Sequence, residues 1–305
     1  MSVYDAIRDY NLRLDTLSLP RILDFKVEGG DIICSIISNE YEHIAIPKFV
    51  SRVYVSREGL KKGKELTNLK SIKFGEKLDY IGSTTFANSI RLEKVENTDN
   101  ITELGNFAFW NCLELKEISL RSLEYIGNSA FCNCSKLERV VIGDNLKEVK
   151  DSAFFGCETL SSIELPAKIK KIGFQAFMGC GLTKVRIPAN IRSIGDCAFN
   201  SCKSLREVEF YGEIVKGQTG MIREKAFKDC SSLKEFTIPD GITSIGASAF
   251  ENCTQLERIV IGESVTNIRE NAFKNCNKLK EVHIKSRVLV ARDPNIFGKA
   301  KIIKC

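Results

Sequence analysis

A leucine returns every 22 or 23 residues across most of this chain, and no other feature limits the possible folds as strongly. One unit reads L-x-x-I-x-I-P-x-x-I-x-x-I-G-x-x-A-F-x-x-C-x-x, most completely in Leu233–Arg258. One spacing, from Leu205 to Leu233, is 28. The units begin at Leu69, Leu92, Leu115, Leu137, Leu160, Leu182, Leu205, Leu233, Leu256 and Leu279. A fixed period of this length predicts a solenoid, because each unit buries its apolar face only when neighbouring units stack on it.

The first part of each unit has the pattern of a short strand. In the unit that begins at Leu233, apolar Phe236 and Ile238 alternate with polar Glu235 and Thr237, which is the period of two that strands show. Stacked units place these strands side by side and parallel. Ten of them at about 4.8 Å per strand predict a sheet about 50 Å long.

The second part of each unit, A-F-x-x-C, places Phe and Cys three residues apart, as on one side of a helical turn. Ser152, Ser248 and Asn271 stand at the entrance of such segments, where they are expected to cap the turn. The repeated phenylalanines are expected to form one internal column: Phe86, Phe109, Phe131, Phe154, Phe177, Phe199, Phe227, Phe250 and Phe273. The predicted fold is an α/β solenoid, a leucine-rich repeat array of about ten 22–23-residue units. It would have one continuous parallel sheet, short helical or 3-10 turns opposite, and caps at both ends.

The ends of the array depart from the template, as expected where an open end would expose core and an unpaired strand edge. An amphipathic helix over about residues 3–14 and a hairpin at Gly29-Gly30 are expected near the start. The predicted organisation is an N-terminal cap at 1–40, a degenerate first repeat at 41–68, nine leucine-rich repeats at 69–278, and a C-terminal degenerate repeat and cap at 279–305.

Eight of the 12 cysteines share one template position: Cys112, Cys134, Cys157, Cys180, Cys202, Cys230, Cys253 and Cys276. Side chains stacked in this way point in parallel directions, whereas a disulfide needs its Cβ atoms to converge. We therefore expect a ladder of free thiols that act as small apolar core residues. Cys34, Cys132, Cys197 and Cys305 lie off the ladder. No metal site is expected, because the chain has no zinc-type cysteine spacing and only two histidines.

The repeated A-F-x-x-C-x-x-L-x-x-I-x-I-P-x-x-I-x-x-I-G resembles the BspA-like leucine-rich repeats of the Treponema pallidum type, over about residues 24–305. That family occurs in bacterial and protist surface proteins and is named for an adhesin. The resemblance implies binding of proteins through the solenoid surface. One departure is that Lys150, Arg223 and Arg269 replace the glycine of the I-G pair, so this turn does not strictly require a left-handed residue.

Functional residues are expected at positions that vary between units, since the repeated positions are committed to the core. On the exposed strand face, one such position reads Val141, Glu164, Arg186 and Glu209 in four consecutive units. Neighbours are often of opposite charge, and such cross-strand pairs contribute about 0.2–1 kcal/mol each. Two interpretations stay open: a solvated face that neutralises itself, or a concave face that binds a protein.

The residue after the column Phe is apolar in four consecutive units and polar from Asn200 onward. We call these four residues the apolar stripe: Trp110, Cys132, Phe155 and Met178. Contiguous exposed apolar surface usually marks an interaction site, and Trp and Met are common at interfaces. The stripe could bind a partner protein or a second copy in a homodimer. Alternatively, residues 1–40 fold back over it or the turn tucks it inward.

Two further segments are candidates for contacts. The segment GEIVKGQTGM, between Tyr211 and Ile222, carries about five extra residues and is expected to form a loop, either functional or simply tolerated. The unit from Leu279 onward holds seven Lys and Arg against two acids. This charge would suit an acidic partner, or it belongs to a solvated cap.

An enzyme is the least expected class. His43 and His283 stand at opposite ends of the array, so they are not expected to form a Ser-His-Asp or Cys-His pair, and no phosphate-binding or zinc-protease motif is present. No cofactor is expected, no basic track with aromatics suggests nucleic acid, and no apolar run is long enough for a membrane span.

The expected function is a non-catalytic protein-protein interaction scaffold. A start without a signal-peptide pattern favours the cytoplasm. The alternative is a surface adhesin-type protein that binds host or matrix proteins and is exported by a route the sequence does not show.

Overall fold

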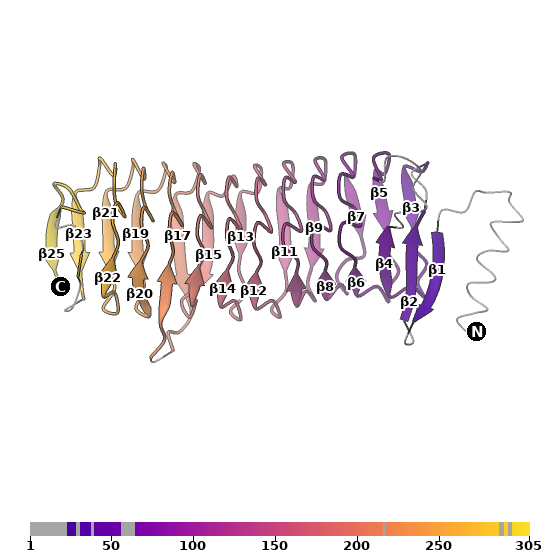
Figure 1. The fold of residues 1–305 in the computed structure, drawn as a ribbon, viewed down its shortest axis with the longest axis horizontal. Helices are drawn as coiled ribbons and strands as arrows, with labels where there is room; N and C mark the ends of the chain where they lie inside the picture. Colours follow the sequence, from indigo (N-terminus) through magenta and orange to yellow (C-terminus); the bar gives the residue numbers. More distant parts are fainter. Residues whose placement is uncertain are drawn as a thin grey trace, which may run out of the picture.

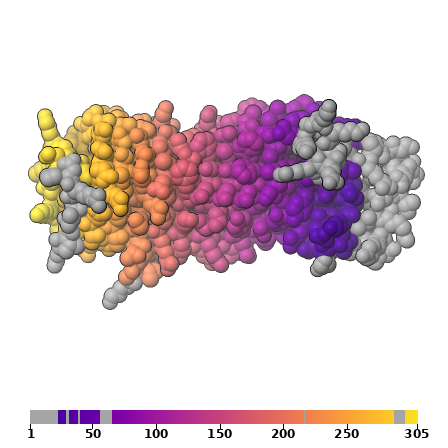
Figure 2. Space-filling view, in the orientation of Figure 1, coloured from indigo at the N-terminus to yellow at the C-terminus, as the bar shows by residue number. Residues whose placement is uncertain are grey.

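The fold is an elongated β-solenoid in which each turn of the chain stacks on the turn before it (Figures 1 and 2). It is a computed structural model that describes residues 23–28, 31–37, 40–55, 65–215, 217–286, 290–291 and 295–305. The array has about 11 turns of about 23 residues, as the returning leucine predicts. The core runs along its length, because the repeated Leu, Ile, Phe and Cys side chains are buried in successive turns.

Each turn contributes two strands, and most strands pair in parallel with their equivalents in the neighbouring turns. The first strand carries the L-x-x-I-x-I part of the template. These first strands are β3 (His43–Ala45), β5 (Ser71–Lys73), β7 (Lys94–Glu96), β9 (Glu117–Leu120), β11 (Arg139–Ile142), β13 (Ser162–Glu164), β15 (Lys184–Pro188), β17 (Glu207–Tyr211), β19 (Glu235–Ile238), β21 (Arg258–Ile261), β23 (Glu281–Ile284) and β25 (Lys301–Lys304).

The second strand carries the I-x-x-I part, and in most turns it is only two residues long. These second strands are β2 (Asp31–Ile36), β4 (Arg52–Val55), β6 (Tyr80–Ile81), β8 (Glu103–Leu104), β10 (Tyr125–Ile126), β12 (Glu148–Val149), β14 (Lys171–Ile172), β16 (Ser193–Ile194), β18 (Gly220–Ile222), β20 (Ile242–Ile245), β22 (Asn267–Ile268) and β24 (Val290–Ala291). At the N-terminal end, β1 (Leu23–Glu28) pairs antiparallel with β2, and Glu28 lies opposite Asp31.

The expectation of one continuous parallel sheet is wrong. First strands divide into four short sheets (β3-β5-β7, β9-β11, β13-β15-β17 and β19-β21-β23-β25), and second strands form two more (β1-β2-β4-β6-β8-β10 and β12-β14-β16-β18-β20-β22-β24). The second series exists because both apolar residues of I-x-x-I are buried, as Ile242 and Ile245 are. The extended backbone between them then pairs with the neighbouring turns.

The expectation of short helical or 3-10 turns is also wrong, since the described residues contain no helix. Two left-handed residues flank each Ala-Phe pair instead. In the turn of Phe177, Gln175 has φ 54° and Gly179 has φ 73°. Left-handed residues interrupt the run of right-handed dihedrals that a helix requires. Ser152, Ser248 and Asn271, expected as caps, take φ values of 53°, 54° and 58°.

The phenylalanine column is confirmed. Consecutive rings from Phe86 to Phe273 lie parallel or nearly so, with neighbouring centroids 5.1 to 5.4 Å apart. This spacing falls within the range of favourable aromatic pairs. The rings therefore join every turn of the regular array to its two neighbours through the core.

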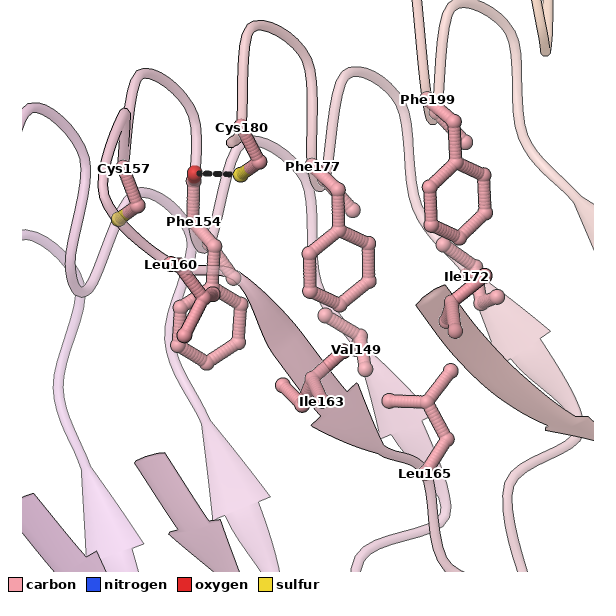
Figure 3. Close-up of a cluster of buried hydrophobic side chains, with 14 of the residues drawn as sticks. Val149, Phe154, Cys157, Leu160, Ile163, Leu165, Ile172, Phe177, Cys180 and Phe199 are labelled. Atoms are coloured by element: carbon pink, nitrogen blue, oxygen red, sulfur yellow. Dashed lines mark hydrogen bonds between the residues drawn. The ribbon is translucent and has the colours of Figure 1, made fainter. Parts of the chain in front are cut away.

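The eight ladder cysteines are free thiols, as expected, and so are the other four. Each ladder thiol also donates a hydrogen bond to the carbonyl oxygen of the column Phe in the preceding turn. Cys180 Sγ lies 3.0 Å from the oxygen of Phe154 (Figure 3). The N–H of the same Phe154 donates to the oxygen of Ala176 at 2.8 Å. Adjacent turns are thus joined at the A-F-x-x-C segment by a thiol-to-carbonyl hydrogen bond and by a backbone hydrogen bond.

Where the I-G pair has its glycine, most adjacent turns approach so closely that a Cβ would clash with the backbone of the neighbouring turn. A Cβ on Gly195 would lie 2.6 Å from the carbonyl oxygen of Gly173, and neither residue has a positive φ. Lys150 replaces this glycine at a point where both neighbouring turns carry glycine, Gly127 and Gly173. The reasoning that this position does not require a left-handed residue therefore holds.

Candidate interaction surface

The apolar stripe lies on the turns of four consecutive units. Trp110, Cys132, Phe155 and Met178 are all half-buried, so each keeps part of its side chain in contact with solvent. Each one follows a column Phe that is fully buried. The turn therefore does not tuck the stripe fully inward. The alternative in which residues 1–40 cover it depends largely on residues 1–22, including the expected helix at 3–14, which lie outside the described residues.

Phe107 extends the stripe, and sequence reasoning missed it. Its side chain is 41% exposed and meets Trp110 edge-on, with ring centroids 6.3 Å apart and an interplanar angle of 78°. Its φ is 58°, which is unusual for a bulky residue. Other units carry small or polar residues there: Thr84, Ser129, Ser152, Gln175, Cys197, Lys225, Ser248 and Asn271. Comparing this position across units would have identified Phe107 as its one aromatic residue.

Two hollows lie along the stripe. The first, of about 390 Å³, is lined by Val55, Glu65, Thr84, Ala87, Asn88, Phe107 and Trp110. Two of its polar side chains already bond to each other, since Asn88 Nδ2 donates a hydrogen bond to Glu65 Oε1 at 2.6 Å. The second, of about 410 Å³, includes Phe155 and Met178 among its lining residues. Both volumes lie at the lower end of the range for small-molecule pockets, about 300–1,000 Å³, so size alone does not decide what would fill them.

The Cys132 thiol adds to the apolar character of the stripe. Its pKa is raised to about 11, mainly by burial and also by the nearby Cys134, while a hydrogen bond with the Trp110 side chain opposes the shift. The thiol is therefore neutral at physiological pH. A neutral thiol behaves as a small apolar group, so the stripe carries no charge of its own.

The four strand-face residues lie on neighbouring first strands, away from the turns that carry the stripe. Arg186 on β15 contacts Glu164 on β13 at 2.5 Å and Glu209 on β17 at 3.2 Å. Its guanidinium also lies 4.7 Å from the ring centroid of Tyr211. Val141, on β11, is half-buried and lines a hollow with Glu164 and Tyr211.

Charge on this part of the strand face is mutually compensated. Lys184 contacts both Glu207, at 2.8 Å, and Glu209, at 3.1 Å. A hydrogen bond from Lys184 lowers the pKa of Glu209, and Arg186 lowers it further, while partial desolvation opposes them. The geometry favours the interpretation of a solvated face that neutralises itself.

The inserted loop between β17 and β18 extends beyond the other turns (Figure 1). Gly212 and Gly217 take φ values of 79° and 78°, and the Gln218 amide donates to the carbonyl oxygens of Ala189 and Ile191 at 3.2 and 2.9 Å. The loop is thus tied to the preceding turn. Its Ile214 and Val215 are exposed, which adds a small apolar tip that sequence reasoning did not single out.

The reasoning that no Cys-His pair can form is wrong. Cys305 Sγ lies 3.8 Å from His283 Nδ1, because β25 adds to the sheet beside β23 and brings the end of the sequence next to that histidine. The other histidine, His43, contacts Ser71 Oγ at 2.7 Å instead. Within the described ranges, no group of three or more His, Cys, Asp or Glu side chains is arranged to hold a metal ion. No helix suited to crossing a membrane occurs in the part of the chain that the structure describes.

The sequence matches the model of the BspA type leucine rich repeat region (six copies) over residues 64–180, 124–221 and 213–304. Similar solved structures include a leucine rich cell surface protein from Faecalibacterium prausnitzii, 23% identical, with 88% of this chain and 94% of that chain covered and a TM-score of 0.42. The leucine rich repeat protein of T. pallidum is 19% identical, with 77% and 88% covered and a TM-score of 0.47.

The pneumococcal vaccine antigen PcpA is 17% identical, with 94% and 98% covered and a TM-score of 0.44. No curated protein sequence matches this chain significantly. The matched ranges together span most of the 305 residues, and the A-F-x-x-C segment and the I-G glycine recur through them. This chain belongs to the BspA type leucine rich repeat family.

Proposed function

We propose that this chain is a non-catalytic interaction scaffold that binds a protein through the apolar stripe and Phe107. The observation that carries the proposal is the exposed Phe107–Trp110 pair. Phe107 holds a left-handed backbone that favours smaller or polar residues and still leaves 41% of its side chain in solvent. Neither feature helps the solenoid to stack, since the other turns fold with small or polar residues at the same position.

The surface around this pair has the composition of an interface centre. Trp, Phe and Met are common there, and charged residues are scarce. The stripe itself is uncharged, and a hollow lies beside each end of it. Energetically important interface residues usually fill such pockets, so we expect the partner to insert apolar side chains here. The strand-face residues Val141, Glu164, Arg186 and Glu209 are a weaker candidate, because their charges already pair with one another.

The partner is either a different protein or a second copy of this chain, and the solution mass separates the two. Light scattering over a concentration series should be run on the natural protein, on Phe155→Asp, and on Lys274→Asp. Lys274 occupies the position of Phe155 in a later unit and is exposed, so it is a matched control. A dimer that only Phe155→Asp dissociates would identify a second copy as the partner.

A monomer at every concentration would direct the search to a different protein. Affinity capture should then be compared between the natural chain and the same two variants. The proposal requires that Phe155→Asp loses a captured protein that Lys274→Asp retains. If both variants behave like the natural chain in mass and in capture, the stripe is not the binding surface.

The compartment remains a separate proposal. A scaffold acting in the cytoplasm and an adhesin-type protein at the cell surface would use the same stripe but meet different partners. The Faecalibacterium relative is described as a cell surface protein, which motivates testing the second option. Cell fractionation, together with protease treatment of intact cells, distinguishes them: only a surface protein is degraded while the cells remain closed.

A further inference from the structure

We propose that Cys305 is a modification site that exchanges its thiol with small disulfides carrying carboxylates, assisted by His283. All 12 cysteines lie within the described residues, and Cys305 is the one that is exposed. Seven of the eight ladder thiols are buried and Cys276 is half-buried, and all of them donate to backbone carbonyls. The chain therefore separates structural thiols from a single accessible one, and that one lies beside an imidazole.

The sheet places three side chains of this site on one face. β23 and β25 pair with Glu281 opposite Lys301 and His283 opposite Ile303. The N–H of Cys305 donates to the oxygen of Ile284 at 3.0 Å, which continues this ladder one step further. Because side chains alternate along a strand, Glu281, His283 and Cys305 share a face. Their positions are fixed by backbone pairing rather than by a loop.

The hydrogen bonds determine which ring nitrogen faces the sulfur. His283 Nε2 lies 3.1 Å from Glu281 Oε2, and a carboxylate can only accept, so Nε2 carries the proton in the neutral ring. Nδ1 is then an acceptor, 3.8 Å from Cys305 Sγ. The hydrogen bond with His283 lowers the pKa of Glu281, with smaller contributions from Arg258 and Lys301 and with desolvation opposing. Glu281 is thus a positioning residue for this imidazole.

This arrangement supports a balanced exchange. The thiol proton passes from Sγ to His283 Nδ1, and the thiolate attacks one sulfur of the small disulfide. The old S–S bond breaks as the new bond between Cys305 and that sulfur forms. The departing thiolate takes the proton from Nδ1, so the products are a mixed disulfide and one free thiol. The small disulfide supplies the oxidised sulfur, and no other oxidant is required.

The charges around the site favour an anionic disulfide. On β21, Arg258 lies opposite Glu281 and Val260 lies opposite His283. On β25, Lys301 lies opposite Glu281 and Ile303 lies opposite His283. Lys285 follows β23 on the same face, whereas Lys304, opposite Ile284, lies on the other face by the same alternation. Glu281 is the one acid among these groups. A net positive neighbourhood attracts carboxylates, as oxidised glutathione carries.

The test is a rate measurement on the full chain. Reduced protein is mixed with oxidised glutathione or with the cationic disulfide cystamine at pH 7, and adducts at each cysteine are followed by peptide mass spectrometry. The variants are His283→Gln and the control His43→Gln, which changes the chain's other histidine, on a first strand at the opposite end of the array. Cys305→Ser identifies the signal from the site.

Cys305 should form adducts before the half-buried Cys132, Cys197 and Cys276. His283→Gln should slow its reaction at pH 7 by about threefold or more, with no change in His43→Gln, and the difference should shrink at alkaline pH, where thiols ionise without a base. The rate of adduct formation at Cys305, divided by the rate for free cysteine, should be higher with glutathione disulfide than with cystamine. High salt should reduce this difference. The buried ladder thiols would react faster if His283→Gln unfolded the chain, so unchanged rates at those cysteines show that the fold is intact.

Three results would overturn the proposal. The first is an equal rate in His283→Gln and in the natural chain, which would leave the imidazole without a role. The second is a reaction at Cys132 or Cys197 as fast as at Cys305. The third is a preference for cystamine, which would contradict the charge argument.

Discussion

The thiol of Cys180 donates to the carbonyl oxygen of Phe154 in the preceding turn, at 3.0 Å (Figure 3). The same oxygen also accepts the N–H of Cys157 at 3.2 Å. The equivalent thiol-carbonyl bond recurs for every ladder cysteine. The repeated cysteine is therefore a structural donor, which explains why a polarisable thiol rather than a simple methyl group occupies this position.

Removing one such thiol should destabilise the array. Cys180→Ala deletes the donor to Phe154 and leaves a small void, so we expect a loss of about 1–3 kcal/mol in the free energy of unfolding. Urea denaturation measures it. Cys197→Ala, which changes a half-buried thiol outside the ladder, is the control and should change stability by less than about 0.5 kcal/mol. Equal effects of the two substitutions would mean that the bond does not matter.

Truncating one ring of the column should have a larger effect. Phe177 is fully buried between Phe154 and Phe199, at centroid distances of 5.3 and 5.2 Å. Phe177→Ala is expected to cost about 3–5 kcal/mol, measured by urea denaturation. Phe174→Ala is the matched control in the same turn, because Phe174 is 46% exposed. A cost below about 1 kcal/mol for Phe177→Ala would contradict the role of the column.

Stability should fall at alkaline pH. Burial raises the pKa of the Cys112, Cys157, Cys202, Cys230 and Cys253 thiols well above the ordinary value. Above about pH 8.5 the unfolded chain loses these protons while the folded chain keeps them. Each thiol then removes about 1.4 kcal/mol of stability per pH unit. Below that pH the folded and unfolded thiols are both neutral, and this contribution stays constant.

Urea denaturation at pH 8, 8.75 and 9.5 measures this slope. Cys157→Ala lacks one of the buried thiols, so its stability should decline less steeply than that of the natural chain. Parallel declines in the two proteins would show that the ladder thiols do not cause the alkaline loss.

Adding a methyl group at the I-G position should disturb the contact between turns. A Cβ at Gly127 would lie 2.4 Å from the backbone nitrogen of Asn106, so Gly127→Ala should cost about 1–3 kcal/mol through overpacking. Thermal unfolding followed by circular dichroism would detect it. Arg223→Ala changes the same template position where a side chain already fits, and it should leave the midpoint nearly unchanged. A similar midpoint for both variants would contradict the close-approach argument.

Repetition decides which of these features the sequence alone predicts. Phe177 and Cys180 could be assigned to the core because their positions recur in unit after unit. The turns could not, because a spacing of three between Phe and Cys fits a helical turn and equally fits the pair of left-handed residues at Gln175 and Gly179. The second strands are mostly two residues long, too short to show a period.

The candidate sites depend on departures from the template, and these are harder to read. Trp110 and Phe155 were found because they fall in consecutive units at one position. Phe107 was missed because it is a single exception at a position that elsewhere looks like part of a turn. The segment between β23 and β25 departs from the repeat template. The spacing of the leucines therefore did not predict that these two strands pair and bring Cys305 next to His283.

The proposed function requires that the apolar stripe contacts a partner protein in the cell. Photo-crosslinking tests it most directly, with a benzophenone-bearing amino acid placed at position 155 and, as the matched control, at position 274. We expect a protein adduct, with a second copy or with another protein, from position 155 and not from position 274, and loss of that adduct in Trp110→Ala. Equal adducts from both positions, or an adduct from 155 that persists in Trp110→Ala, would contradict it.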